Sequence, residues 1–419
     1  MRRPSTPPLL RENRCFRNFW TGQTISLFGD QISLLAIPLL AAIELDVGPA
    51  QMGLLTAAAL APNLVFSIHL GLWTDRRPRR RRLMVAADIG RALLLLTIPI
   101  AWLLGALTLA QLYVVSFAAG SLGVLFSVAY DIVFVSMVDR EEYIEGSSLL
   151  NGSRAASIVA GNGAAGILVQ AITAPFALLV DAFSYVVSAF FVGRSGAGEA
   201  PPAEPEAGLA GLAAGGRFIA RTPLIRASLL ACATLNLFNT AFYGLLVLYA
   251  TRHLGMSAGA IGIALAIGGL GSIFGALLTR WLSSRFGLGR ALVASFVLTP
   301  APLLLIPLMA GAPTGMVAPV VAIAEFLNGV GVMVLDVGLG ALYASMVPNA
   351  LRARVSGAFL LVNYGIRPIG ALAGGVLAAI IGLQPTMWIA AVGALAGVLW
   401  LLPSPMPRLR ELPQAAVDY

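Results

Sequence analysis

Several acidic residues lie inside long apolar stretches of the sequence, and three of them are candidates for chemistry: Asp30, Glu325 and Asp336. In a bilayer interior such an acid faces a cavity or a partner group, because a charged side chain against lipid is costly. Desolvation also disfavours the charged form of a carboxyl group, so a buried acid of this kind can exchange a proton. We therefore treat the three acids as candidate coupling sites for a proton or for another cation such as sodium.

A structural interpretation is also open for each acid. Asp30 would then only hydrogen-bond to a neighbouring helix. Glu325 and Asp336 are about three helical turns apart and share a face, and an acid on that face could instead pair with Arg367 to pack two helices together. We favour the coupling role for Asp30, and for Glu325 and Asp336 we keep both interpretations.

Uncharged polar residues recur at helical spacing around these acids. Some share a face with Asp30, others repeat along the stretch 226–250, and one follows Glu325 by a single turn. These candidates for lining a substrate cavity are Gln23, Ser26, Ser33, Asn236, Asn239, Tyr243 and Asn328. The alternative is that they hydrogen-bond between helices and hold the bundle together.

The bulk of the chain has the composition of a membrane protein. It is 58% hydrophobic and only 11% charged, with a mean hydropathy of +0.87, whereas soluble proteins have roughly 25% charged residues. Every basic side chain apart from the two histidines is an arginine. Without lysine there is no ordinary phosphate-binding loop, so an ATP-driven pump is not expected. Two cysteines and two histidines make no metal pattern. We therefore expect no catalytic residue, no metal and no cofactor.

Apolar stretches long enough to cross a bilayer recur along the chain. A transmembrane helix needs about 20 such residues, and we count about twelve stretches. Their ranges are 19–43, 50–74, 83–105, 109–134, 148–172, 174–193, 226–250, 258–281, 290–310, 315–345, 355–381 and 385–402. The fold class predicted is an all-α membrane protein.

The loop arginines fall on alternate sides of these predicted spans. The densest group lies at 76–82, and only Arg252 falls on the opposite side. Because positive loops are retained in the cytoplasm, we predict a multi-pass protein of the cell membrane with both termini inside. A net charge of +8 is also compatible with nucleic-acid binding, but that requires a basic face on a soluble domain. We expect a lipid bilayer and no nucleic acid as a partner.

The two halves of the chain repeat each other. Four residue pairs are each separated by 209 positions: Arg76 and Arg285, Met137 and Met346, Gly161 and Gly370, Gly166 and Gly375. Parallel six-helix repeats with a site at the midplane are the architecture of facilitator-type transporters. We predict six-helix bundles at 1–194 and 224–404, a cytoplasmic linker at 195–223 and a cytoplasmic tail at 405–419. The linker includes a short interfacial helix at 208–219.

The loop after the second predicted span carries a glycine, an Asp-Arg pair and further arginines. This pattern resembles the loop between the second and third helices of the major facilitator superfamily. The resemblance implies a cytoplasmic ion network that latches the two halves together; alternatively, these charges only set the topology. The gate candidates are Gly71, Asp75, Arg76, Arg80, Asp131 and Arg285. The residues that would let helices pack closely and rock are Gly161, Gly166, Pro368, Gly370 and Gly375.

The first predicted span resembles one branch of that superfamily. Gly29 and Asp30 are followed by Pro38, and the residues before them fit the same pattern: Asn13, Phe16, Arg17, Trp20, Gly22 and Gln23. The branch is that of drug and siderophore exporters, the transmembrane secretion effectors and macrolide-efflux-like proteins. The resemblance implies proton-coupled export of an amphipathic small molecule by alternating access. The alternatives are a nutrient importer or uniporter of the same fold, and a non-transporting protein such as a scramblase or receptor.

Overall fold

The computed structural model describes residues 7–75, 79–196, 208–348 and 351–412, and all regular structure within these ranges is helical. Twelve helical stretches of the described residues are long and apolar enough to cross a membrane, which confirms the predicted fold class. The longest helices are α2 (Arg14–Ile43), α3 (Pro49–Asp75), α4 (Arg80–Leu103), α5 (Leu109–Met137), α10 (Pro223–Arg252), α11 (Ala258–Phe286), α14 (Thr314–Met346) and α15 (Arg352–Ile381).

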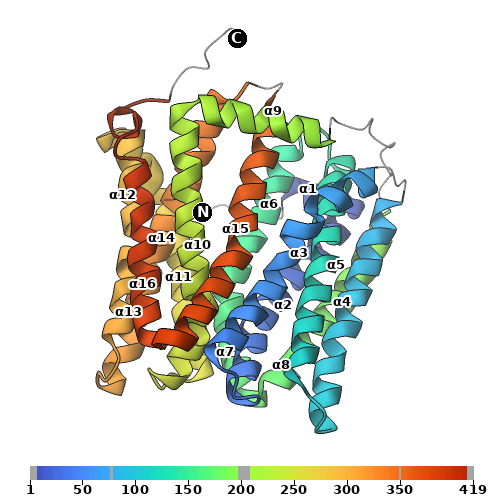
Figure 1. Ribbon diagram of the computed structural model, residues 1–419. Helices are drawn as coiled ribbons and strands as arrows, with labels where there is room; N and C mark the ends of the chain where they lie inside the picture. Colours follow the sequence, from blue (N-terminus) through green and yellow to red (C-terminus); the bar gives the residue numbers. More distant parts are fainter. Residues whose placement is uncertain (1–6, 76–78, 197–207, 349–350, 413–419) are drawn as a thin grey trace, which may run out of the picture. The chain divides into compact units, whose positions relative to one another are not determined.

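Shorter helices complete the spans and lie between them (Figure 1). They are α1 (Pro8–Glu12), α6 (Tyr143–Ala156), α7 (Asn162–Ile172), α8 (Ala174–Arg194), α9 (Gly208–Arg221), α12 (Leu288–Leu298), α13 (Leu305–Leu308) and α16 (Leu383–Leu395). Short 3-10 segments lie at Ala301–Leu304, Ala396–Trp400 and Met406–Arg408, and a π-helical turn lies at Ser157–Gly161.

By packing, the chain divides into two compact units. The first consists of Met1–Leu45 and Ala61–Pro205, and the second of Asp46–Leu60 and Glu206–Tyr419. Helix α3 is therefore shared between them: its first part packs within the second unit and the rest within the first.

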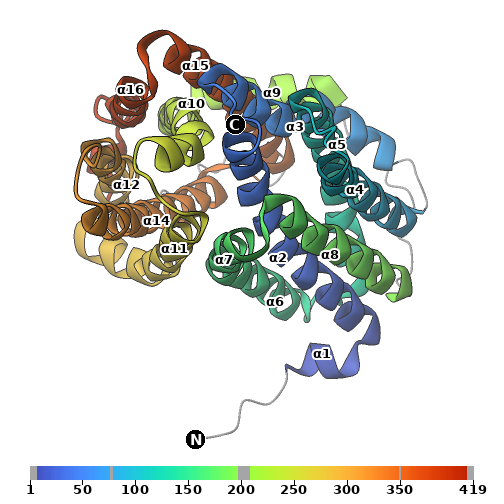
Figure 2. The same cartoon turned by 90° about the horizontal axis from the view of Figure 1, so that it is seen from below.

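In the first unit, α8 packs against both α2 and α4 (Figure 2). Asn13 precedes helix α2, and its side chain accepts a hydrogen bond from the backbone amide of Phe16, as expected of an N-cap. Its contact with α8 is close because Gly22 has no side chain: a Cβ there would lie 3.2 Å from the Ser188 carbonyl oxygen. This packing holds the polar residues of α2, α4 and α8 near one another inside the unit.

The fifth span is one continuous helical stretch with a π-helical turn at Ser157–Gly161. The extra residue of such a turn widens the helix, and π-turns are often found at functional sites. Gly161 closes the turn against α2, where a Cβ would lie 2.9 Å from the Gln31 side chain. Gly166, one turn further along α7, is buried.

In the second unit, the closest helix pairs are α11 with α14 and α10 with α15. Small residues allow both contacts, as expected where lipid gives helices no hydrophobic reason to associate. A Cβ at Gly275 would lie 2.6 Å from the Val330 carbonyl oxygen of α14, and Gly370 packs against the Leu237 backbone of α10. Gly375 lies against Gly53, where a Cβ would be 2.8 Å from the Gly53 Cα.

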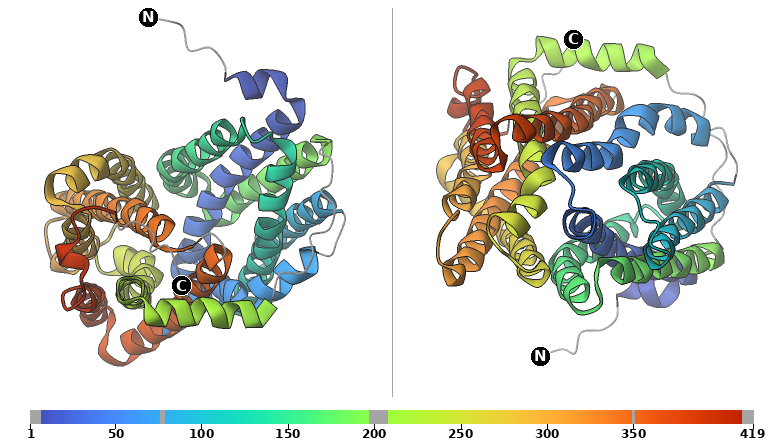
Figure 3. Two further views of the ribbon diagram at one scale, coloured as in Figure 1. Left: turned by 90° about the horizontal axis from the view of Figure 1, so that it is seen from above. Right: turned by 60° about the horizontal axis from the view of Figure 1, so that its bottom comes forward.

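Helix α9 packs along α15 (Figure 3), and it coincides closely with the interfacial helix predicted at 208–219. Its Ile219 is buried in a small apolar cluster with Ile225, Val347 and Val355. The predicted linker therefore ends in a helix that is anchored to the second unit.

We expect Gly275→Val to destabilise the second unit, because the new side chain would force α11 away from α14. Overpacking of this kind costs about 1–3 kcal/mol, which thermal unfolding of the purified protein should detect as a lower Tm. The matched control is Gly340→Val, since a Cβ at Gly340 of α14 meets no atom within 4 Å. Equal Tm values for the two variants would contradict this account of the α11–α14 contact.

Candidate functional site

Asp30 lies in a cluster of charged and polar side chains at the junction of α2, α4 and α8. Its Oδ1 accepts a hydrogen bond of 2.5 Å from the Tyr185 hydroxyl. Arg91 Nη1 of α4 lies 3.9 Å from the same oxygen and binds Asp88 more tightly. Asp88 and Arg91 are three positions apart, a spacing at which two side chains of a helix meet. The cluster therefore joins all three helices through one guanidinium group.

Asp181 of α8 is a third carboxyl group in this region. Its two oxygens accept hydrogen bonds from Ser33 of α2 and from Ser184, the latter at 3.0 Å, and the residue has no exposed surface. Asp181 was not among the coupling candidates predicted from the sequence. The spacing of Asp181, Ser184 and Tyr185, three and four residues apart, places the three on one face of α8, but it does not show which helix that face meets.

This cluster contains more acidic side chains than basic ones. Asp30, Asp88 and Asp181 surround a single cation, Arg91, whose guanidinium also lies over the Tyr185 ring at 4.2 Å from its centroid. Asp88 and Asp181 are fully buried, whereas 34% of the Asp30 side chain is exposed. Asp30 is thus the least enclosed of the three carboxyl groups. With all four groups ionised, the three carboxylates and one guanidinium give the cluster an excess of negative charge.

The other polar residues predicted on α2 take different positions. Gln23 and Ser26 are both buried, at 5% and 4% exposure, and Gln23 Nε2 has no hydrogen-bond partner in the structure. Ser33, in contrast, donates a hydrogen bond to the Asp181 carboxylate. The predicted face therefore contributes Asp30 and Ser33 to the cluster.

Glu325 lies in a second polar cluster, inside the second unit. The residue is 4% exposed, and its Oε2 lies 2.9 Å from the Tyr243 hydroxyl of α10. The same hydroxyl lies 3.0 Å from Asn328 Oδ1, and Asn328 Nδ2 donates to the Thr299 carbonyl at 2.7 Å. Three residues predicted separately from the sequence, Glu325, Tyr243 and Asn328, are thus brought together here.

The hydrogen atoms of this second cluster can be counted. The Thr299 carbonyl only accepts, so the Asn328 amide nitrogen must face it and the amide oxygen must face Tyr243. A phenol has one proton, so it makes a full hydrogen bond to only one of the two acceptors; donation to both would be shared between them. Both contacts are satisfied if Glu325 donates a proton to the Tyr243 oxygen while Tyr243 donates to Asn328. No salt bridge to Glu325 occurs among the residues that the structure describes.

The remaining cavity candidates of α10 differ from each other. Asn236 accepts a hydrogen bond from Arg367 Nε at 3.0 Å and donates to Asn363 Oδ1 at 2.8 Å. Asn239 Oδ1 is buried without a partner. Asp336 is exposed, and within the described part of the chain it forms no ion pair with Arg367.

The predicted gate falls partly outside the described residues. Arg76 lies outside the described residues, and so does the side chain of Asp75, whereas Gly71 is described only as part of the α3 backbone. Arg80 is buried at 3% exposure, and its Nε donates to the Thr74 carbonyl at 3.3 Å. Asp131 is exposed and interacts electrostatically with Arg154 of α6, and Arg285 is exposed at the end of α11.

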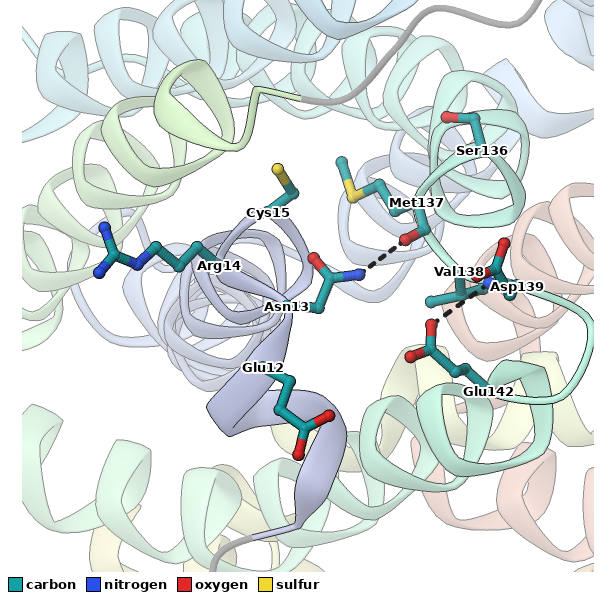
Figure 4. A pocket seen from close by; sticks show the side chains of 9 residues that line it. All are labelled: Glu12, Asn13, Arg14, Cys15, Ser136, Met137, Val138, Asp139 and Glu142. Carbon is teal, nitrogen blue, oxygen red and sulfur yellow. Dashed lines mark hydrogen bonds between the residues drawn. The ribbon is translucent and has the colours of Figure 1, made fainter.

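A cavity of about 560 Å³ opens in the first unit away from these clusters (Figure 4). It lies between the start of α2 and the end of α5, where Asn13 Nδ2 donates to the Met137 carbonyl at 2.9 Å. Cys15, Asp139 and Glu142 are among its lining residues. None of the predicted coupling or substrate residues contributes to it. Within the described ranges, no group of histidine, cysteine, aspartate and glutamate side chains could hold a metal ion.

Comparison with known proteins shows what kind of molecule carries these clusters. The transmembrane secretion effector family matches residues 5–418 of the chain. The chain belongs to this family. Members of the transmembrane secretion effector family are transporters of the major facilitator superfamily and not enzymes, as the motifs at 71–82 and around Asp30 had predicted.

Two relatives are similar over nearly their whole lengths. The MFS-type transporter YfiS of Bacillus subtilis (strain 168) is 27% identical over 396 residues, which cover 90% of each chain. The multidrug efflux pump Tap of Mycolicibacterium fortuitum is 26% identical over 413 residues, 93% of this chain and 94% of Tap.

Solved structures show the same fold at low identity. A bacterial homologue of the iron transporter ferroportin in an inward-facing state matches with a TM-score of 0.74 and 17% identity, covering 95% of this chain and 99% of the other. The nucleoside transporter NupG matches with a TM-score of 0.70 and 14% identity, covering 93% and 98%.

We expect Arg91→Leu to destabilise the first unit by about 3 kcal/mol or more, because removing one partner of a buried ion pair leaves an uncompensated charge. Thermal unfolding of the purified variant measures this as a lower Tm. The double variant Arg91→Leu/Asp88→Leu should recover part of the loss, since no ion of the pair then remains. A double variant as unstable as the sum of the two single variants would show that the two side chains do not interact.

Proposed function

We propose that this member of the transmembrane secretion effector family exports an amphipathic small molecule in exchange for protons. The family membership supports a small-molecule substrate in a membrane. The multidrug efflux pump Tap, a distant relative, supports export. The hydrogen-bond chain at Glu325 supports the proton as coupling ion, and the proposal depends on this chain most of all.

In the proposed mechanism, Glu325 carries a proton in the conformation described here. The chain then runs in one direction, from the Glu325 hydroxyl to Tyr243, from Tyr243 to Asn328 and from Asn328 to the Thr299 carbonyl. Loss of the proton leaves a buried carboxylate that needs the Tyr243 proton for itself, because a buried charge without a partner is costly. Tyr243 must then release Asn328. Deprotonation therefore changes a contact between α10 and α14.

Asp30 is the second proton site in this proposal. It is partly exposed and lies in a cluster with more acids than bases, so protonation there lowers the excess negative charge inside the first unit. Asp336 is the third candidate, exposed on α14. The apolar faces of the spans, interrupted by these few polar groups, suit an amphipathic substrate. Transport would follow alternating access, with Asp75, Arg76 and Arg80 as part of a gate at the cytoplasmic surface.

We expect Glu325→Gln to abolish transport driven by a pH gradient while downhill exchange of substrate continues. The amide imitates the protonated acid, so substrate still binds but no proton is released. The measurement uses inverted membrane vesicles and a fluorescent amphipathic dye, with gradient-driven accumulation and dye exchange recorded on the same preparation. Asp30→Asn should also abolish gradient-driven accumulation without loss of membrane insertion.

The control for this experiment is Glu141→Gln, which makes the same chemical change at an exposed position between α5 and α6. It should behave as wild type. Gradient-driven accumulation by Glu325→Gln at the wild-type level would remove Glu325 from the coupling mechanism. If the wild-type protein moves the dye out of the inverted vesicles and not into them, the protein is an importer and not an exporter.

The proposed orientation, with both termini in the cytoplasm, can be tested with the two native cysteines. Cys15 is partly exposed at the start of α2, whereas Cys232 is buried. We expect a membrane-impermeant maleimide to label inverted vesicles but not intact cells, and Cys15→Ser to lose the label. Labelling of Cys15 in intact cells would show that the N-terminus lies outside the cell, opposite to the proposed orientation.

A further inference from the structure

Arg367 is a charged side chain in the middle of α15 that the proposed proton sites do not use. About 20 Å of helix lies on either side of it, at 1.5 Å per residue. Arginine stays protonated in proteins, so this position holds a permanent positive charge at the centre of a membrane span. Such charges face a water-filled cavity or a partner and mark ligand pathways.

The guanidinium of Arg367 is held in place from two sides. Its Nε donates to Asn236 Oδ1 of α10 at 3.0 Å, and its Cζ lies 4.5 Å from the centroid of the Tyr364 ring. Asn236 is itself fixed, because its amide nitrogen donates to Asn363 Oδ1 and to the Cys232 carbonyl. The orientation of the guanidinium is therefore set before any ligand arrives.

The outer edge of the same guanidinium contacts no partner in the part of the chain that the structure describes. Among the described residues, no carboxylate lies within ion-pair distance of Arg367 and no hydrogen bond of Nη1 or Nη2 occurs. These two nitrogens are not enclosed either, since neither is among the buried polar atoms that lack a partner. Arg91, the comparable cation of the first unit, is by contrast paired with Asp88 and 7% exposed.

We propose that Arg367 binds an anionic group of the transported molecule through Nη1 and Nη2, and that this group is a carboxylate. The free edge of a guanidinium presents two parallel N–H donors, which match the two oxygens of a carboxylate. This proposal rests on the transport function proposed above and narrows its substrate class to amphipathic monocarboxylates.

The charges around Arg367 favour one negative charge on the ligand over two. Asp336 of α14 is exposed and close enough to act electrostatically on Arg367. A dianionic phosphate would gain from Arg367 but would be repelled by Asp336, whereas a monocarboxylate satisfies the guanidinium with less repulsion. The Tyr364 ring, 40% exposed beside the guanidinium, supplies apolar surface for the rest of an amphipathic ligand.

The experiment measures whether Arg367 is free and whether a carboxylate covers it. Purified protein in lipid nanodiscs is treated with phenylglyoxal, which modifies accessible arginines, and modification of Arg367 is followed by peptide mass spectrometry. The probes are 2-naphthoate and its neutral isostere 2-naphthamide. We expect Arg367 to react, 2-naphthoate to protect it and 2-naphthamide not to protect it. Arg91 should stay unmodified as the internal reference.

Direct binding of radiolabelled 2-naphthoate gives the second readout. Arg367→Gln should weaken it by about tenfold or more, the effect of losing hydrogen bonds to a charged group. Arg367→Lys keeps the charge but not the two parallel donors, so it should bind with intermediate strength. Asp336→Asn should strengthen binding, because it removes the repelling charge.

Four outcomes would overturn the proposal. If Arg367 does not react with phenylglyoxal, or if 2-naphthoate and 2-naphthamide protect it equally, Arg367 is not an anion site. Undiminished binding of 2-naphthoate to Arg367→Gln places the ligand elsewhere. A marked rise in Arg367 modification in Asp336→Asn would show that the guanidinium was paired with Asp336 and not free. None of these measurements uses a pH gradient, so a failure of proton coupling is recognised separately from a failure of this site.

Discussion

The structure depends on one constraint: a charge inside a membrane span has no bulk water to solvate it. Each charge there must therefore find a partner, lose its charge, or face a space that water or a ligand can enter. In our proposals, this chain uses all three solutions. Arg91 is paired with Asp88, Glu325 lies among neutral hydrogen-bonding groups, and Arg367 presents its free edge to whatever binds there.

The two polar clusters meet this constraint in different ways, one through ion pairs and the other through neutral hydrogen bonds, and this difference matters for the proposed transport. In the first unit one guanidinium is surrounded by three carboxyl groups, so electrostatics holds α2, α4 and α8 together and a proton changes the balance of charge. In the second unit a single buried carboxyl group ends a chain of neutral donors and acceptors. There, in our proposal, a proton decides which partner Tyr243 binds, and with it the contact between α10 and α14. The glycine contacts allow the helix backbones to lie close enough for such short chains to form.

Much of the architecture was predictable from the sequence, because the bilayer sets a length and a hydropathy that each span must meet. The predicted spans agree with the helices to within a few residues at most ends. Glu325, Tyr243 and Asn328 were each predicted from helical spacing, which gives the face of a helix but not which faces of different helices meet. For that reason the sequence did not link Asp30 to Asp181 and Tyr185, which lie about 150 residues further along the chain. The π-helical turn at Ser157–Gly161 was also missed, since a local change of helical repeat leaves no mark on hydropathy.

The most direct test of the account is the protonation state of Glu325 itself. Infrared absorption of the purified protein in lipid, near neutral pH, should contain a band of a protonated carboxyl group that is lost in Glu325→Gln and shifted in Tyr243→Phe, which removes its hydrogen-bond partner. A spectrum in which the Glu325→Gln variant loses no such band would mean that Glu325 is ionised, and the proposed proton chain through Tyr243 to Asn328 would be wrong.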